Sequence, residues 1–187
     1  MWQKLAASLR GLQFTFLLMV CAGGGYIGYV ILVAVLLPLE SEPMEAMFCD
    51  PFMVKFILAL LPINSIVEEA MRLSPIALVI FLTKNESKGT RNGIIWSMTV
   101  ITAVIFGMMH VNITGSILKG VLIQGVCGLL FNVLYLRTGG LDGKAFVAYM
   151  ACVITHTAVN YSFAALMFLG QILLWHTDGP TASICAP

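Results

Sequence analysis

Two adjacent carboxylates and a guanidinium, Glu68, Glu69 and Arg72, lie inside an otherwise apolar stretch of the sequence. A charged side chain at bilayer depth is costly unless it is paired or faces water, so ionisable residues in such a stretch are candidates for a functional site. Arg72 follows Glu68 by four positions and Glu69 by three, so either carboxylate can neutralise it on one face of a helix. This cluster is the first candidate for chemistry in the chain.

Two of the three histidines lie in other apolar stretches. His110 follows Phe106 by four positions and His156 precedes Asn160 by four, so the members of each pair share a helix face. The two pairs belong to different apolar stretches, so each would come to a common site from a helix of its own.

The depth of these groups can be compared by counting along each helix from the basic residue at its end. The separations are 16 residues from Glu68 to Lys84, 19 from His110 to Arg91, and 12 from His156 to Lys144. At 1.5 Å per residue they correspond to roughly 24, 28 and 18 Å. With tilt and kinks, one layer about 10 Å thick can hold all three groups, in the outer half of the bilayer. We therefore expect one carboxylate and two imidazoles at similar depth.

These side chains suit the hydrolysis of an amide. A carboxylate in a membrane cavity can take a proton from water, and imidazole and the Asn160 amide can donate to a developing oxyanion. Glu68 with His110 and His156 would also suit Zn²⁺. No Ser or Cys stands beside a base as an evident nucleophile. A structural polar network, or a proton or ion path as in a small transporter, is the alternative for the same residues.

The composition excludes a soluble protein. Of the 187 residues, 59% are hydrophobic and 10% are charged, whereas soluble domains carry about 25% charge. We therefore expect an all-α, polytopic transmembrane helical bundle that forms a single domain over residues 1–187. The net charge of +1 argues against nucleic acid as a partner. The expected partner is the lipid bilayer. The sequence does not specify an oligomeric state.

Five spans are predicted, at about residues 12–39, 52–83, 92–111, 117–136 and 145–175. The second is longer than a crossing needs, so a sixth span is the alternative if residues 52–61 cross or re-enter before Pro62. Nine basic residues lie outside the Glu68–Arg72 cluster. In the five-span arrangement seven of them fall on one side of the membrane, and Lys55 and Lys119 fall on the other. The basic side faces the cytoplasm. We therefore expect a cytoplasmic N-terminus, and a multi-pass protein of the plasma membrane.

The three motifs, in this order, resemble those of the CAAX protease and bacteriocin-processing (CPBP, or Abi) family of intramembrane proteases. The family pattern is EExxxR, then FxxxH, then HxxxN or a similar small residue in place of the Asn. The corresponding segments here are Glu68–Arg72, Phe106–His110 and His156–Asn160, and residues 134–141 resemble the loop before the last motif. The resemblance covers residues 61–163, which we take as the CPBP-like catalytic core.

The resemblance implies a glutamate-dependent peptidase that needs no metal, with Glu68 activating water. His110 would position the water or the substrate, and His156 and Asn160 would hold the oxyanion. Glu69, Arg72 and Phe106 would support the site. The implied substrate is a membrane-embedded peptide or a lipidated protein, such as a prenylated CAAX protein or a bacteriocin leader. A non-catalytic immunity protein or peptide-binding member of the family is the alternative.

One position departs from the family pattern. Arg72 comes one residue early, giving EExxR. Alignment on the glutamates keeps Glu68 as the base, whereas alignment on the arginine puts Val67 in that place. We favour the first alignment, because two histidines without a base would serve no purpose. Glu69 as the active carboxylate is the alternative.

Overall fold

The computed structural model describes residues 2–36 and 51–178, and every regular element in these ranges is helical. The elements are α1 (Trp2–Leu36), α3 (Pro51–Leu82), α4 (Lys88–Met109), α5 (Val111–Thr114), α6 (Ile117–Gly120), η2 (Val121–Gly125), α7 (Val126–Arg137), η3 (Gly140–Asp142) and α8 (Ala145–Asp178). The prediction of an all-α bundle is confirmed. The single-domain boundary of 1–187 remains a prediction.

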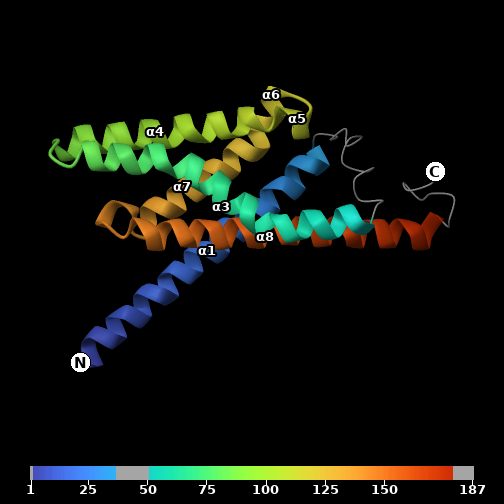
Figure 1. Ribbon diagram of the computed structural model, residues 1–187, viewed down its shortest axis with the longest axis horizontal. Coiled ribbons are helices and arrows are strands. Elements are labelled where there is room, and N and C mark those ends of the chain that lie inside the picture. Colours follow the sequence, from blue (N-terminus) through green and yellow to red (C-terminus); the bar gives the residue numbers. More distant parts are fainter. Residues whose placement is uncertain (1, 37–50, 179–187) are drawn as a thin grey trace.

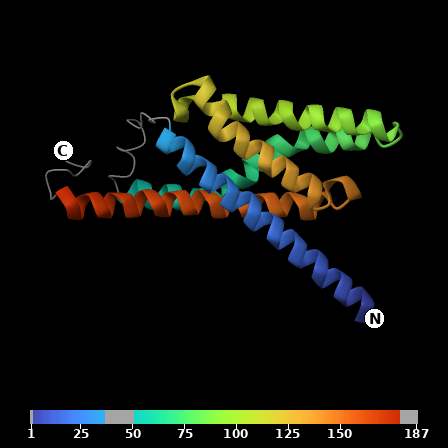
Figure 2. The same cartoon turned by 180° about the vertical axis from the view of Figure 1, so that it is seen from behind.

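Helix α3 is the element around which the others pack. It runs antiparallel to both α8 and α4, with its first part beside α8 and its second part beside α4 (Figure 1). Helix α7 crosses between them and contacts α4 and α8. Helix α1 packs obliquely across α8 and α7, and its N-terminal end projects away from the bundle (Figure 2). One helix, α3, therefore reaches all the elements that carry the candidate motifs.

Four helical segments are long and apolar enough to cross a membrane: Gln13–Val33, Lys88–Met109, Ile117–Asp142 and Ala145–Gly170. They coincide with four of the five predicted spans. The fifth, α3, carries Glu68, Glu69 and Arg72 near its middle. Helix α3 is continuous through Pro62, so the alternative of a separate span before this proline is wrong. The chain is a multi-pass membrane protein.

The basic loops lie together at one end of the bundle. The α3–α4 loop and the α7–α8 loop lie at the same end as the start of α1 (Figure 1). The α7–α8 loop turns sharply through Gly139 and Gly143, at φ of 128° and 75°, values that glycine adopts without the cost a Cβ imposes. The arrangement agrees with the distribution of basic residues used to orient the chain. That this end faces the cytoplasm remains a prediction.

Close backbone contact joins α4 to η2. A Cβ added at Gly107 would lie 2.6 Å from the Cα of Val121, and one added at Gly120 would overlap the Gly107 carbonyl oxygen. Small residues permit this approach between helices in a membrane. The contact holds the end of α4, where His110 lies, against the following segment. Helix α4 ends at Met109, two residues before the predicted end of this span.

Candidate active site

Glu68 faces two imidazoles that come from other helices. Its Oε2 lies 3.5 Å from Nε2 of His156 on α8, and its Oε1 lies 4.0 Å from Nε2 of His110 at the end of α4. The Glu68 side chain is 23% exposed, so it is accessible from outside the helical bundle. The structure thus brings together three groups that are far apart in the sequence, and we call Glu68, His110 and His156 the acceptor cluster.

The hydrogen bonds at Nδ1 of the two rings determine whether each Nε2 atom is a donor or an acceptor. The Nδ1 of His110 lies 2.7 Å from the Phe106 carbonyl oxygen, and the Nδ1 of His156 lies 2.9 Å from Oε1 of Glu69. Both partners accept hydrogen bonds, so each Nδ1 carries the hydrogen and donates it. In a neutral ring the Nε2 atom is then an acceptor. The three groups of the acceptor cluster therefore suit a molecule that donates hydrogens, such as water.

Glu69 lies in a different environment from its neighbour. Its side chain has no exposed surface, and Nη2 of Arg72 donates to its Oε2. Its Oε1 accepts from His156, as described above. Both oxygens of this carboxylate are therefore occupied by protein groups. We call Glu69, Arg72 and Asn132 the buried network.

Asn132 is a member of this network that the sequence analysis missed. It lies on α7, fully buried, and its Oδ1 accepts from Nη1 of Arg72, which also donates to the Gly128 carbonyl. The Asn132 Nδ2 donates to the Thr99 carbonyl at 2.9 Å and to Thr102 Oγ1 at 3.0 Å, both on α4. The signal in the sequence that could have identified it is the position of a polar residue, Asn132, within an apolar stretch. The network thus ties α3, α4 and α7 together.

Two phenyl rings enclose Arg72. Its guanidinium carbon lies 5.6 Å from the ring centre of Phe106 and 5.7 Å from that of Phe131, within the range of cation–π attraction. Phe106 also packs on His110, with ring centres 4.5 Å apart, and Phe131 packs on His156 at 5.4 Å. Phe106 was predicted as a supporting residue, whereas Phe131 was missed. These rings fix the planes of both histidines.

Asn160 lies one helical turn beyond His156 but does not touch the acceptor cluster directly in this structure. Its Nδ2 donates to Ser65 Oγ at 3.3 Å, and Ser65 in turn donates to the Leu61 carbonyl at 2.9 Å. On α3, Nδ2 of Asn64 donates to Oε1 of Glu68. Asn64 and Ser65 are contacts that the sequence analysis missed. Asn64 binds Glu68 on the same helix, and Ser65 links α3 to Asn160 on α8.

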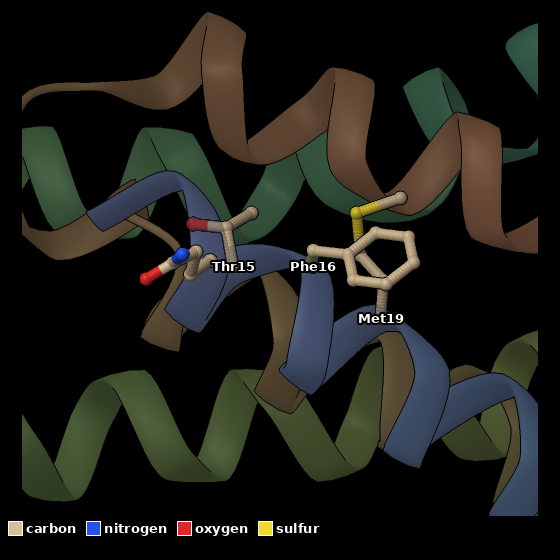
Figure 3. A pocket seen from close by; sticks show the side chains of 4 residues that line it. Thr15, Phe16 and Met19 are labelled. Carbon is tan, nitrogen blue, oxygen red and sulfur yellow. The ribbon is translucent and has the colours of Figure 1, made fainter. Parts of the chain in front are cut away.

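Two further features bear on ligands. Within residues 2–36 and 51–178, no group of three or more His, Cys, Asp or Glu is arranged to hold a metal ion; independence from metal remains a prediction. A cavity of about 380 Å³ lies against α1, lined by Gln13, Thr15, Phe16 and Met19 (Figure 3). None of the candidate site residues lines it.

Comparison with known families gives a match to type II CAAX prenyl endopeptidase Rce1-like over residues 50–162. No curated protein and no solved structure matches the chain. The matched region covers more than half of the chain and includes every candidate site residue from Asn64 to Asn160. It corresponds to the resemblance seen in the sequence, and the family indicates a CAAX-type intramembrane protease. The chain belongs to the Rce1-like family of type II CAAX prenyl endopeptidases.

Proposed function

We propose that the protein is an intramembrane endopeptidase in which Glu68 activates the attacking water. The observation that carries the proposal is the orientation of the two glutamates. Glu68 is partly exposed and faces the Nε2 atoms of His110 and His156, whereas both oxygens of Glu69 are bound to other side chains. Of the two carboxylates, only Glu68 has an oxygen free to accept a proton from water.

The first step uses Glu68 and His110. Their separation of 4.0 Å is longer than a hydrogen bond, but a water beside the pair can reach both at ordinary distances. The water donates one hydrogen to the Nε2 of His110 and the other to Glu68. Glu68 takes the second proton as the water oxygen forms a bond to the carbonyl carbon of the substrate. The carbonyl π electrons move to its oxygen and produce the oxyanion.

The oxyanion requires donors, and His156 and Asn160 are suited to supply them. In this step His156 is used in its protonated form and not in the neutral form that accepts at Nε2: Nε2 then donates to the oxyanion while Nδ1 remains bound to Glu69. The Asn160 amide carries a second hydrogen beyond the one given to Ser65. As the tetrahedral intermediate collapses, the C–N bond breaks and Glu68 returns its proton to the leaving amine. Two donors of this kind stabilise charge that develops in the transition state.

The family description supports a substrate class. We propose that the substrate is a membrane-associated peptide, with a prenylated CAAX protein as the first candidate. A peptide without a lipid, such as a bacteriocin leader, is the other candidate from the sequence motifs. A substrate held by its lipid in the bilayer can approach a site inside a helical bundle laterally.

The proposal is tested with the purified full chain in liposomes and a farnesylated CAAX peptide, with cleavage followed by mass spectrometry. Glu68→Gln should lower kcat by about a thousandfold, as expected for loss of a general base, while the protein keeps its fold by circular dichroism. Glu86→Gln, an exposed carboxylate in the α3–α4 loop, is the matched control. Full activity of Glu68→Gln would overturn the mechanism. Glu68-dependent proton flux without cleavage would favour a transporter.

Metal dependence is tested separately in the same assay. Exhaustive chelation should leave the rate unchanged, because the proposed mechanism places water directly on Glu68. Loss of activity that Zn²⁺ restores would instead assign Glu68, His110 and His156 as zinc ligands. Metal analysis of the purified protein by mass spectrometry provides the independent measurement.

A further inference from the structure

Pro62 leaves a backbone carbonyl without its helical partner inside α3. Proline has no N–H, so the Leu58 carbonyl, four residues earlier, cannot accept the usual helical hydrogen bond. An unsatisfied carbonyl in lipid costs several kcal/mol, and in helices with an internal proline a neighbouring group commonly replaces the donor. The structure shows which group does so here.

Tyr161 on α8 supplies the donor. Its hydroxyl donates to the Leu58 carbonyl oxygen at 2.9 Å. Tyr161 is the residue after Asn160, whose amide donates to Ser65 on the same helix α3. Two consecutive residues of α8 therefore bind α3 on either side of Pro62. The contact fixes α8 relative to α3 one turn beyond His156.

We propose that Tyr161 is a positioning residue that sets the place of Asn160 by satisfying the carbonyl that Pro62 leaves free. The proposal rests on the proposed function, because it assigns Tyr161 a task in holding an oxyanion donor. The dependence on Pro62 is the specific part of the proposal. If Leu58 had an amide partner, the Tyr161 hydroxyl would be a second, optional donor.

Tyr149 offers a matched comparison within the same pair of helices. Its hydroxyl donates to the Ile66 carbonyl of α3 at 2.8 Å. Four residues after Ile66 comes Ala70, which has an N–H, so this carbonyl keeps a potential helical donor. Removal of the Tyr149 hydroxyl deletes a similar bond between the same helices but leaves no carbonyl without a donor. Tyr149→Phe is therefore the control for Tyr161→Phe.

The experiment is a double-mutant cycle on the full chain in liposomes, with Tyr161→Phe, Pro62→Ala and the double variant. Tyr161→Phe should lower kcat about tenfold with little change in KM, since the Leu58 carbonyl loses its donor within the membrane and a transition-state donor is displaced. In the Pro62→Ala background the same change should lower kcat less than about twofold, because the N–H of Ala satisfies Leu58. Tyr149→Phe should resemble wild type.

The melting temperature in micelles provides a readout that does not depend on activity. Tyr161→Phe should lower it by several degrees in the presence of Pro62 and hardly at all with Pro62→Ala. Equal effects of Tyr161→Phe in both backgrounds, in kcat and in melting temperature, would overturn the proposal. If Glu68→Gln keeps full activity, the proposed function fails, but the melting temperatures still test the Pro62 dependence.

A final measurement applies if Pro62→Ala does not fold. Infrared spectroscopy of the chain labelled with ¹³C at the Leu58 carbonyl reports whether that carbonyl accepts a hydrogen bond. Its band should shift to higher frequency in Tyr161→Phe and stay in place in Tyr149→Phe. An unchanged band in Tyr161→Phe would show that Tyr161 does not satisfy Leu58, and would also overturn the proposal.

Discussion

Glu68 and Glu69 are neighbours in the chain, yet their carboxylates lie in two different environments. The Glu68 side chain is 23% exposed and faces the histidines of the acceptor cluster. The Glu69 side chain has no exposed surface and is bound by Arg72 and His156 in the buried network. His156 touches both, with Nδ1 on one carboxylate and Nε2 toward the other.

The comparison shows how a single residue step along a helix can separate a fully buried, ion-paired carboxylate from a partly exposed one. Successive residues of a helix point about 100° apart, so two adjacent carboxylates face different neighbours. The buried charge of Glu69 is neutralised by Arg72, whose Nη1 donates to the Gly128 carbonyl and to Asn132. The buried network therefore holds α3, α4 and α7 together, while the side chains of the acceptor cluster remain available to a ligand.

The largest expected difference between the two regions is in stability. Glu69→Gln should lower the free energy of unfolding by about 3–5 kcal/mol, because it leaves Arg72 as an uncompensated buried charge. Glu68→Gln should change it by less than about 1 kcal/mol, because this side chain is partly exposed and, among the described residues, its ion-pair partners are histidines and not Arg or Lys. Unfolding in micelles, followed by circular dichroism, measures both. Equal losses would show that both glutamates belong to one structural network.

A smaller effect is expected where α4 meets η2. Gly107→Ala should cost about 3 kcal/mol, because the added Cβ would overlap the backbone at Val121. The displacement of α4 should also lower kcat, since it moves His110 away from Glu68. Gly93→Ala is the control on the same helix, because a Cβ there meets nothing within 4 Å. If Gly107→Ala retained wild-type kcat and stability, the close contact would not position His110.

The smallest expected loss of stability is that of replacing Asn132 in the buried network. Asn132→Leu should lower the free energy of unfolding by about 1–2 kcal/mol, because Arg72 loses one acceptor and the Thr99 carbonyl loses one donor. Asn92→Leu, at an exposed position of α4, should change it by less than about 0.5 kcal/mol. Chemical unfolding in micelles measures both variants. A neutral result for Asn132→Leu would show that Gly128 and Glu69 suffice to hold Arg72.

Much of the fold was accessible from the sequence because it depends on local properties. Apolar stretches of sufficient length predict membrane helices wherever they occur, and four of the predicted spans meet this criterion in the structure. The family resemblance rested on three short motifs and agrees with the match over residues 50–162. Helical spacing also placed Phe106 with His110 and His156 with Asn160, since residues four apart share a face.

The sequence could not determine what depends on how the helices rotate and pack against one another. The early position of Arg72 left open which glutamate faces the histidines, and only the packing of α3 against α4 and α8 turns Glu68 toward them. Asn132, Phe131 and Tyr161 were missed for the same reason. Their partners, Arg72, His156 and Leu58, lie on other helices. Hydropathy and spacing determine which segments become helices, whereas the direction in which each side chain points is decided by contacts between them.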